Sequence, residues 1–488
     1  MSRLIKIVCL LVVALLYLLF PTTNSTNDAY AYAAYIKYGH TLAEPFHLLY
    51  NYLGFMAYKL VGLIFEPEVL TMMKVLNSIA AVVGLFLLSK ILNRIGANEK
   101  QNILLVMMCA FSFGVWRFAT ENETYILPVV FSLLASLYYL KYLEKPSIIR
   151  IVIIAFWASF ACLFHVIHFF WWIGLFLGVF YKSRKLASVI FYFLPSLIVP
   201  VVYMIVVHST RNCGFSVKCL WSFFTPVLTS DSVQYNIGAD NFYLGVINFF
   251  RTFYQVHGYM IFLVKKNLLF LLPALLSVSF AVIAVFRLMR QKLLCTSKPI
   301  HFILLHILIL VLQLLWAVYS KGNAEFMVML PFLLAIIAVY YIKSDPKFLG
   351  WMVASLFVWN MSYGILPGHF ADFNKREKLI ERIINDKASI YILEQGKEVQ
   401  NQIFYRTGEE DIERVKKLPG NKVEMDSLLL ISKENGINIF TDYYNSHRIV
   451  SRYSITRDNT DFMQLYKIQK ADSIVYFYGI NYLHRFVR

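Results

Sequence analysis

The segment Leu268–Phe286 reads LLFLLPALLSVSFAVIAVF and contains no charged side chain. A helix needs ~20 apolar residues to cross the hydrocarbon core of a bilayer, and this run is close to that length. Its apolar residues are continuous rather than alternating, which favours a helix over a strand. In lipid, only a helix or a closed barrel satisfies its own backbone. The segment therefore predicts a transmembrane helix.

The same pattern recurs along the chain, whose composition is that of a membrane protein. Hydrophobic residues make up 59% of it and charged residues only 15%, whereas soluble domains have roughly 25% charged residues. With the further apolar blocks, the sequence predicts an α-helical polytopic membrane protein of about 11 transmembrane helices. These blocks are Leu4–Phe20, Val69–Ile91, Ile103–Phe118, Tyr125–Tyr142, Ile151–Val166, Phe169–Tyr181, Ala187–Val207, Phe302–Tyr319, Phe326–Ile342 and Phe348–Leu366.

The basic residues orient the chain. Short cytoplasmic loops collect Lys and Arg. When the N-terminus is placed inside, the loops rich in Lys and Arg fall on the cytoplasmic side, and the short outer loops hold almost none. The net charge of +17 is then mostly a consequence of topology. Because these charges are divided among loops rather than gathered on one face, they indicate no nucleic-acid partner. The sequence start also resembles a cleavable signal peptide, but a first helix that stays in the bundle is favoured by its long apolar block.

An odd number of spans places the C-terminus outside. The sequence predicts a transmembrane domain over 1–366, with outer loops 21–68 and 208–266, and a small extracytoplasmic α/β domain over 367–488. In the α/β domain we expect two helices, three strands and a helix cap at Gly436. A disulfide between Cys213 and Cys219 is left open by their spacing. The expected elements are helices Lys375–Asn385 and Val423–Lys433, and strands Ser389–Leu393, Ile437–Tyr443 and Ser473–Tyr478.

Two outer stretches read as helices lying in the membrane interface rather than as spans. Leu49–Phe65 is apolar but interrupted by Asn51, Gly54 and Lys59. Phe242–Tyr259 is rich in aromatic residues and amphipathic. Amphipathic helices of this kind lie in the plane of the membrane surface. The second is expected either to guide a lipid tail or to cover the bundle.

Asp28 has two interpretations. It follows the first apolar block by a few residues and directly precedes a run of helix formers from Ala29 to Lys37. One role is a helix N-cap, accepting hydrogen bonds from the amides of the first turn. The other is a general base at the boundary of water and lipid. The roles are compatible, because a helix N-terminus also favours an ionised carboxylate.

Further ionisable residues lie at the predicted outer ends of spans. Glu121 and Glu123 share a tight loop beside Arg117 and either are solvated, orient an acceptor or bind a divalent cation. His165 and His168 are spaced to bind a metal if one helix continues through both. The alternative for each is an ordinary polar residue near the surface.

Positive charges on the outer side are the exception to the orientation rule, and phosphate is one reason to place them there. Lys and Arg make charge-assisted hydrogen bonds to phosphate oxygens. Lys321, Arg251 and Arg211 fall in predicted outer loops. We therefore take them as candidate ligands of a phosphate, with an ordinary loop charge as the alternative.

At these residues the chain resembles a family. Asp28 to Phe55 is similar to the D-x-x-x-(Y/A)…G…H-P-x-(Y/P) segment of the protein-O-mannosyltransferase-like branch of the GT-C membrane glycosyltransferases. Gly39 and the run Phe46-His47-Leu48-Leu49-Tyr50 match in part, although Pro45 precedes His47 instead of following it. Glu123-Thr124-Tyr125-Ile126-Leu127 looks like the E-x-Y-x-L element, and Glu325 and Pro331 stand where the family places a charge and a proline.

The resemblance implies an activity. Asp28 would be the catalytic base, Glu123 a second active-site carboxylate, and His47 and Glu325 further site residues. The donor would be a polyprenyl-phosphate-linked sugar, and the acceptor an envelope lipid, glycan or protein. Such enzymes invert at the sugar carbon, which suits a single base. The branch also implies the bacterial inner membrane, with the C-terminal domain periplasmic. A divalent cation, Mg²⁺ or Mn²⁺, is left open.

Other functions remain. A polysaccharide polymerase or ligase of the same class is a close variant. A transporter or flippase for a lipid-linked sugar is a second alternative, although the spans carry few ionisable residues and no matching pair of broken helices. An envelope scaffold is a third.

Overall fold

The computed structural model describes residues 2–211, 214–228, 238–256, 259–290, 300–341, 346–371, 373, 377–410, 412–443, 461–476 and 479–487. They divide into two compact units. The first comprises Met1–Thr22 and Thr41–His369, and the second comprises Thr23–His40 and Phe370–Arg488. The predicted outer loop 21–68 is thereby split, because Thr23–His40 folds with the C-terminal residues.

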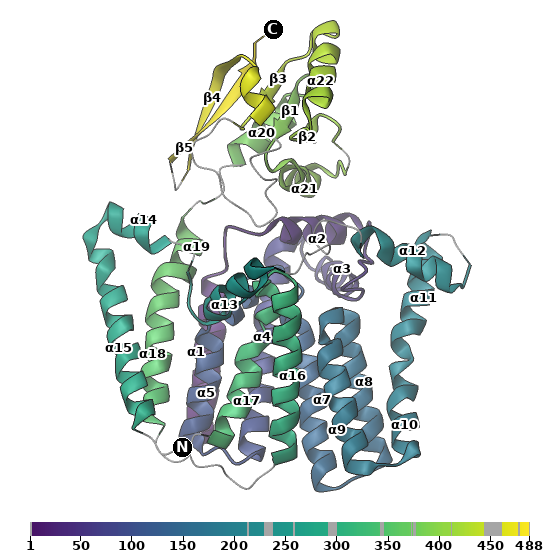
Figure 1. Cartoon of the computed structure of the whole chain (residues 1–488), viewed down its shortest axis with the longest axis vertical. Helices are drawn as coiled ribbons and strands as arrows, with labels where there is room; N and C mark the ends of the chain where they lie inside the picture. The colour runs from purple at the N-terminus through teal and green to yellow at the C-terminus, as the bar shows by residue number, and fades with distance from the viewer. Residues whose placement is uncertain are drawn as a thin grey trace. The chain divides into compact units, whose positions relative to one another are not determined.

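The first unit is a helix bundle (Figure 1). Its N-terminal half contains α1 (Ser2–Leu19), α3 (Tyr50–Val61), α4 (Val69–Arg94), α5 (Glu99–Phe111), α6 (Phe113–Ala119), α7 (Ile126–Glu144), α8 (Ile148–Phe164), η1 (Val166–His168) and α9 (Phe169–Ser183). The rest consists of α10 (Leu186–Ser196), α11 (Ile198–Arg211), α12 (Val217–Leu228), α13 (Ala239–Phe253), α14 (Tyr259–Lys266), η2 (Leu268–Phe270), α15 (Leu271–Met289), α16 (Ile300–Tyr319), η3 (Ala324–Met327), α17 (Leu330–Tyr341), α18 (Lys347–Asn360), the π-helix η4 (Met361–Ile365) and α19 (Leu366–Phe370).

Eight helical segments of the described chain are long and apolar enough to cross a membrane, and the bent pair α5 and α6 makes nine. Two further apolar helices, Leu4–Leu19 and Ile148–Phe164, are shorter. The polytopic helical fold predicted from the apolar blocks is therefore confirmed, and each predicted block is helical over most of its described residues. By length alone, eight or nine rather than eleven of them qualify as spans.

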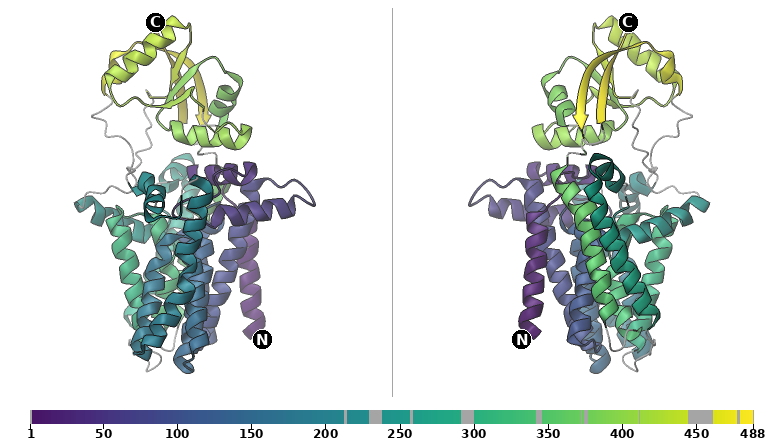
Figure 2. Two further views of the ribbon diagram at one scale, coloured as in Figure 1. Left: turned by 90° about the vertical axis from the view of Figure 1, so that its right-hand side faces the viewer. Right: turned by 90° about the vertical axis from the view of Figure 1, so that its left-hand side faces the viewer.

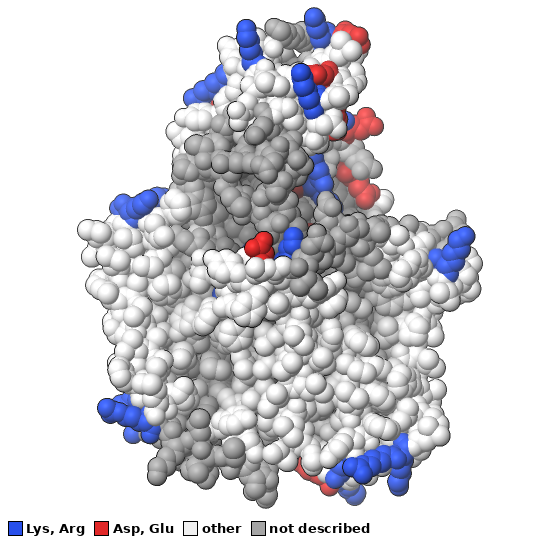
Figure 3. Space-filling model, in the orientation of Figure 1, with Lys and Arg blue, Asp and Glu red and all other residues white. Residues whose placement is uncertain are grey.

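The helices differ in how much of their surface is buried, so the bundle has central and peripheral members. In α7, 72% of the most apolar window is buried within the protein, whereas the window that includes α15 is only 17% buried. The exposed residues of α15 are Leu, Val, Phe and Met side chains, which suit a lipid environment. On the face shown in Figure 3, a broad uncharged band covers these helices, with charged side chains above and below it.

The helices of the first unit run in alternating directions, so their connections fall at two ends (Figures 1 and 2). The N-terminal end is the one where α1 begins, and it holds the α4–α5 and α7–α8 connections. We call the opposite end the distal end. It holds the α6–α7 loop, Thr120–Tyr125, the break between α8 and α9 at His165, and the turn between α16 and η3. The two predicted interfacial helices, α3 and α13, also lie there (Figure 1).

A sharp bend divides the predicted span Ile103–Phe118. The axes of α5 and α6 differ by 65°, because Ser112 takes an extended conformation with φ −65° and ψ 138°. The bend frees backbone carbonyls from the helix. The Asn360 amide nitrogen donates to the Phe111 carbonyl at 2.8 Å and to the Phe253 carbonyl at 2.6 Å. One buried amide thus links the bend to the end of α13.

The second unit is a five-stranded sheet in the order β2-β1-β3-β5-β4, with β1 parallel to β2 and β3, and β5 antiparallel to β3 and β4. Its core is formed by apolar residues of the strands and helices, such as Tyr391, Ile380 and Ile403. Its elements are α2 (Asn27–Tyr38), α20 (Glu377–Asn385), β1 (Ile390–Leu393), α21 (Gly396–Thr407), β2 (Val415–Lys417), α22 (Lys422–Glu434), β3 (Ile439–Thr441), η6 (Asp461–Leu465), β4 (Ile468–Tyr476) and β5 (Gly479–Phe486).

The prediction of a small C-terminal α/β fold is confirmed, with omissions. The predicted helices correspond to α20 and α22, and the predicted strands to β1, β3 and β4. Helix α21 and strands β2 and β5 were not predicted. α2 packs on α21, where the Tyr38 and Phe404 rings stack with centroids 5.6 Å apart and the Asn401 amide donates to Asn27 Oδ1 at 2.8 Å. Cys219 is disulfide-bonded, while Cys213 lies outside the described residues.

Candidate functional site

The α6–α7 loop is buried, although its carboxylates suggested a solvated turn. Glu121 is 0% exposed and Glu123 2% exposed. The Asn77 amide nitrogen from α4 donates to the carbonyls of Glu121, at 2.7 Å, and Glu123, at 2.8 Å. It also lies 3.0 Å from the Tyr50 hydroxyl, which donates to Asn122 Oδ1 at 2.8 Å. The loop is therefore held by a hydrogen-bond network inside the distal end.

Glu121 is surrounded by cations. Its Oε2 lies 3.0 Å from Arg117 NH1, and its Oε1 lies 4.0 Å from Lys74 Nζ. Lys74 also donates to the Thr22 carbonyl at 2.8 Å. A carboxylate that is 0% exposed and lies between two cations acts first as their counter-ion. This arrangement supports a structural role for Glu121 rather than the predicted role of binding an acceptor or a metal.

A second set of polar side chains connects the loop to η3. The Tyr125 hydroxyl donates to Glu325 Oε2 at 3.0 Å. The Tyr125 ring lies 5.0 Å from the His165 ring, which lies 6.2 Å from the His47 ring. Residues far apart in the sequence, including the predicted His47, His165 and Glu325, thus form one cluster. We call His47, Tyr125, His165 and Glu325 the distal cluster.

His165 and His168 do not lie on one continuous α-helix. The helix does not continue through them, because His165 is extended with φ −161° and ψ 122°. Its Nδ1 accepts from the Ile167 amide at 3.2 Å, whereas His168 Nδ1 is 2.7 Å from Ser132 Oγ. Within the described ranges, no group of three or more His, Cys, Asp or Glu side chains is arranged to hold a metal ion. The continuous helix required by the predicted metal pair is therefore not present.

Two of the three candidate phosphate ligands are brought together at the distal end. The Asn248 amide of α13 donates to the Gly322 carbonyl at 2.6 Å, next to Lys321. Arg251 NH1 lies 3.5 Å from Asn248 Oδ1. Lys321 has φ 51°, a left-handed conformation that is costly for a residue with a Cβ. The third candidate, Arg211, ends α11, and its side chain lies outside the described residues.

Asp28 belongs to the second unit and is not the N-cap. Thr26 caps α2, with its side chain accepting from the Ala29 amide at 3.0 Å. Asp28 lies within the first turn and is exposed. The prediction that Asp28 is the N-cap is thus wrong, because the cap lies two residues earlier in the chain. The favourable interaction of the carboxylate with the helix N-terminus remains.

Several buried polar residues of the site were missed by the sequence analysis. Lys74 and Asn77 interrupt an otherwise apolar span, and polar groups inside spans are a signal of function or pairing. Tyr50 and Asn51 lie at the start of α3, where they read as ordinary interfacial residues. All four are buried at the distal end.

The stability of the protein should decrease in mild acid. Burial lowers the pKa of His47 to about 4, against about 6.5 in an unfolded chain. Above pH 6.5 the residue is neutral in both states. Between pH 6.5 and pH 4 the unfolded chain binds a proton that the folded chain excludes. The free energy of unfolding therefore decreases as the pH is lowered, by up to about 1.4 kcal/mol per pH unit.

Melting temperatures of the detergent-purified protein from pH 7.5 to pH 5 test this expectation. His47→Gln should flatten the decrease, while the exposed His40→Gln should retain the wild-type slope. If the melting temperature of His47→Gln decreases with acidification as steeply as that of the wild type, His47 does not contribute to the loss of stability in acid.

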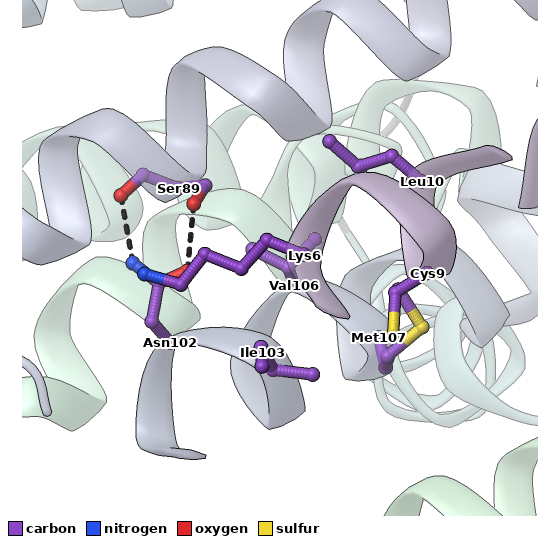
Figure 4. Close-up of a pocket in the computed structure, with 8 residues that line it drawn as sticks. All are labelled: Lys6, Cys9, Leu10, Ser89, Asn102, Ile103, Val106 and Met107. Carbon is purple, nitrogen blue, oxygen red and sulfur yellow. Dashed lines mark hydrogen bonds between the residues drawn. The ribbon is translucent and has the colours of Figure 1, made fainter. Parts of the chain in front are cut away.

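A small pocket at the N-terminal end is separate from this site (Figure 4). It is lined by residues of α1, α4 and α5. Lys6 donates to Asn93 Oδ1 at 3.1 Å, and Ser89 and Asn102 are joined by two hydrogen bonds of 2.7 Å. These polar groups satisfy one another, so the pocket adds nothing to the distal site.

The fold and the site define a polytopic helical membrane protein with an α/β unit and buried polar residues at one end of its helices. No protein-family model and no curated protein matches the chain. A similar solved structure is the oligosaccharyltransferase of Archaeoglobus fulgidus in complex with Zn and sulfate. It has 10% identity and a TM-score of 0.49, over 89% of this chain and 68% of that chain.

Two further structures are similar to a comparable degree. AglB, the archaeal oligosaccharyltransferase from Archaeoglobus fulgidus in complex with an inhibitory peptide and a dolichol-phosphate, has 9% identity and a TM-score of 0.49, over 90% and 69% of the two chains. ArnT from Cupriavidus metallidurans in the apo state has 11% identity and a TM-score of 0.47, over 99% and 97%. At these identities and scores, no family is identified.

Proposed function

We propose that the protein is a membrane glycosyltransferase that moves a sugar from a polyprenyl-phosphate donor to an envelope acceptor. The observation that carries the proposal is the arrangement of the distal end. Buried carboxylates and histidines lie there together with Lys321 and Arg251, at the ends of apolar helices. A lipid-linked donor keeps its tail in the bilayer and its sugar phosphate at the membrane surface, so its catalyst needs these groups at that depth.

Lys321 and Arg251 are the proposed ligands of the donor phosphate. Negative charge grows on the phosphate as the bond to the sugar breaks, and a cation held there stabilises the transition state. Asn248 supports this role, because its hydrogen bond to Gly322 and its contact with Arg251 connect the two cations. Strained residues often lie at functional sites, which favours a binding role for Lys321.

Asp28 is the proposed general base, and Glu123 a second active-site carboxylate. The base would take a proton from the acceptor hydroxyl as that oxygen attacks the sugar carbon, while the phosphate leaves. Such a single displacement inverts the configuration at this carbon. The exposure of Asp28 in the first turn of α2 suits a base that meets an acceptor, and the helix N-terminus keeps it ionised. This is the activity that the sequence resemblance to the GT-C class implies.

The proposal extends to location. We place the protein in a bacterial inner membrane, as the family resemblance implies, with its N-terminus cytoplasmic and its C-terminal unit periplasmic, as the distribution of basic loops favours. Polymerisation or ligation of a surface polysaccharide is a variant of the same chemistry. Transport of a lipid-linked sugar without chemistry is the principal rival.

Glycosyl transfer by the purified protein tests the proposal. Polyprenyl-phosphate hexoses and pentoses serve as donors, with a mixed pool of envelope lipids, glycans and proteins as acceptors. We expect sugar to move to a member of this pool, with one molecule of polyprenyl phosphate released per sugar. Donor that crosses a reconstituted bilayer without release of polyprenyl phosphate would instead identify a transporter.

Lys321→Gly should weaken the use of the donor without unfolding the protein. The loss of a charge-assisted hydrogen bond to phosphate is worth roughly 1.5–3 kcal/mol, so the KM for the donor should rise by about 10- to 100-fold. Glycine tolerates a positive φ, and the free energy of unfolding should change by less than about 1 kcal/mol. Steady-state kinetics over a range of donor concentrations measure the effect.

Arg184→Gly is the matched control for this change. Arg184 also has a positive φ, of 50°, but it ends α9 at the N-terminal end of the bundle. This variant should keep the wild-type KM. An unchanged KM in Lys321→Gly would remove Lys321 from the phosphate site.

A further inference from the structure

Asn51 lies on the inner face of α3. The buried residues of this helix are Tyr50, Asn51 and Gly54, which recur at helical spacing and so share one face. The other side of the helix exposes Met56 and Leu60. The Asn51 side chain is therefore directed into the distal end, and it is 0% exposed.

The Asn51 amide makes no hydrogen bond within the described part of the chain. Neither its Oδ1 nor its Nδ2 has a partner, and both atoms are buried. An unpaired buried amide costs far more than an apolar residue of the same shape, because its hydration is lost without compensation. The preceding Tyr50 shows the contrast, since its hydroxyl contacts both Asn122 and Asn77.

The surroundings of Asn51 belong to the proposed site. The Tyr50 amide donates to the His47 carbonyl at 3.3 Å, so the chain turns directly from His47 into α3. His47 in turn faces His165 of the distal cluster. On the other side, Tyr50 binds the α6–α7 loop that carries Glu123. The residues that directly precede Asn51 in the chain thus contact two parts of the same polar region.

We propose that the Asn51 amide hydrogen-bonds hydroxyl groups of the sugar carried by the lipid-linked donor. This assignment rests on the proposed function and deepens it. A side-chain amide both donates and accepts, as a sugar hydroxyl does, whereas a phosphate only accepts and is matched by Lys321 and Arg251. Because Asn51 is buried, α3 must shift locally to let the sugar reach the amide. Segments that move to admit a substrate and then enclose it are common in enzymes.

The first test is a stability measurement that needs no donor. Asn51→Leu removes the unpaired amide and keeps its approximate shape, so the melting temperature should rise by about 2–4 °C. The matched control is Asn102→Leu. Asn102 is equally buried, but its amide bonds Ser89 and Asn93, so its loss should lower the melting temperature. A decrease in Asn51→Leu would overturn the inference, because the amide would then have partners.

The second test compares polyprenyl-phosphate hexoses and pentoses with sugar-free polyprenyl phosphate as stabilising ligands. In the wild type, a sugar-bearing lipid should raise the melting temperature more than the bare lipid. In Asn51→Leu the bare lipid should still stabilise, the difference should vanish, and the KM for the donor should rise by about 10-fold or more. Asn102→Leu should keep the difference.

The outcomes separate the two proposals. Suppose that the wild type transfers sugar and that Asn51→Leu is still stabilised more by the sugar-bearing lipid than by the bare lipid. The proposed function then stands, but the proposed role of Asn51 is wrong, and its amide binds a buried water instead. If no donor stabilises the wild type more than bare lipid and none is turned over, the proposed function falls, and sugar recognition falls with it.

Discussion

Asp28→Asn is expected to lower kcat for sugar transfer by about 100-fold or more, because positioned general bases contribute roughly 10²- to 10⁴-fold to rates. The amide that replaces the carboxylate cannot take the proton of the acceptor hydroxyl. Folding should be little affected, since Asp28 is exposed and Thr26 caps the helix. The initial rate at saturating donor and acceptor is the measurement.

Glu398→Gln provides a control for the loss of a charge near a helix N-terminus. Glu398 lies in the first turn of α21 in the same unit, so both substitutions remove a similar interaction with a helix dipole, worth about 0.3–1 kcal/mol. Only the change at Asp28 should lower kcat by about 100-fold or more. If Asp28→Asn folds and transfers sugar as well as the wild type, Asp28 only stabilises α2, and the mechanism lacks its base.

Glu121→Gln should produce the largest loss of stability, of about 3–5 kcal/mol, because breaking a buried ion pair leaves an uncompensated charge. The Glu121 side chain is 0% exposed and that of Lys74 is 8% exposed. Without the carboxylate, Lys74 and Arg117, whose side chains are 8% and 24% exposed, would lose a shared counter-ion. The melting temperature of the detergent-purified protein should fall clearly.

Two further variants make this expectation specific. Adding Lys74→Met to Glu121→Gln should recover part of the loss, because it removes one of the two cations that lost this counter-ion. Arg94→Gln breaks the Arg94–Glu144 pair, which is short at 2.7 Å but has side chains 38% and 52% exposed. Exposed pairs are worth about 0–1 kcal/mol, so this change should be nearly neutral. Equal losses at the two pairs would contradict a buried ionic role for Glu121.

The candidate site was predictable only as a set of residue types near predicted loops. The sequence analysis named His47, His165 and Glu325, but it did not predict that these residues lie together with Tyr125. The condition for the metal pair, one continuous helix through both histidines, is not met because the helix breaks at His165. The capping role failed because Thr26, two residues earlier, competes for the same amides. In both cases the path of the chain overrides a local rule.

The sequence by itself determined the apolar helices, because the length and hydropathy of a span are properties of one continuous segment. It also determined α22 and β1, where turn residues and periodicity agree. Only the tertiary structure decided that the α6–α7 loop is buried, that Thr23–His40 joins the α/β unit, and that the Asn51 amide has no hydrogen-bond partner among the residues that the structure describes. Burial and pairing of a polar group depend on segments distant in the sequence, as between Lys74 and Glu121. No local pattern contains that information.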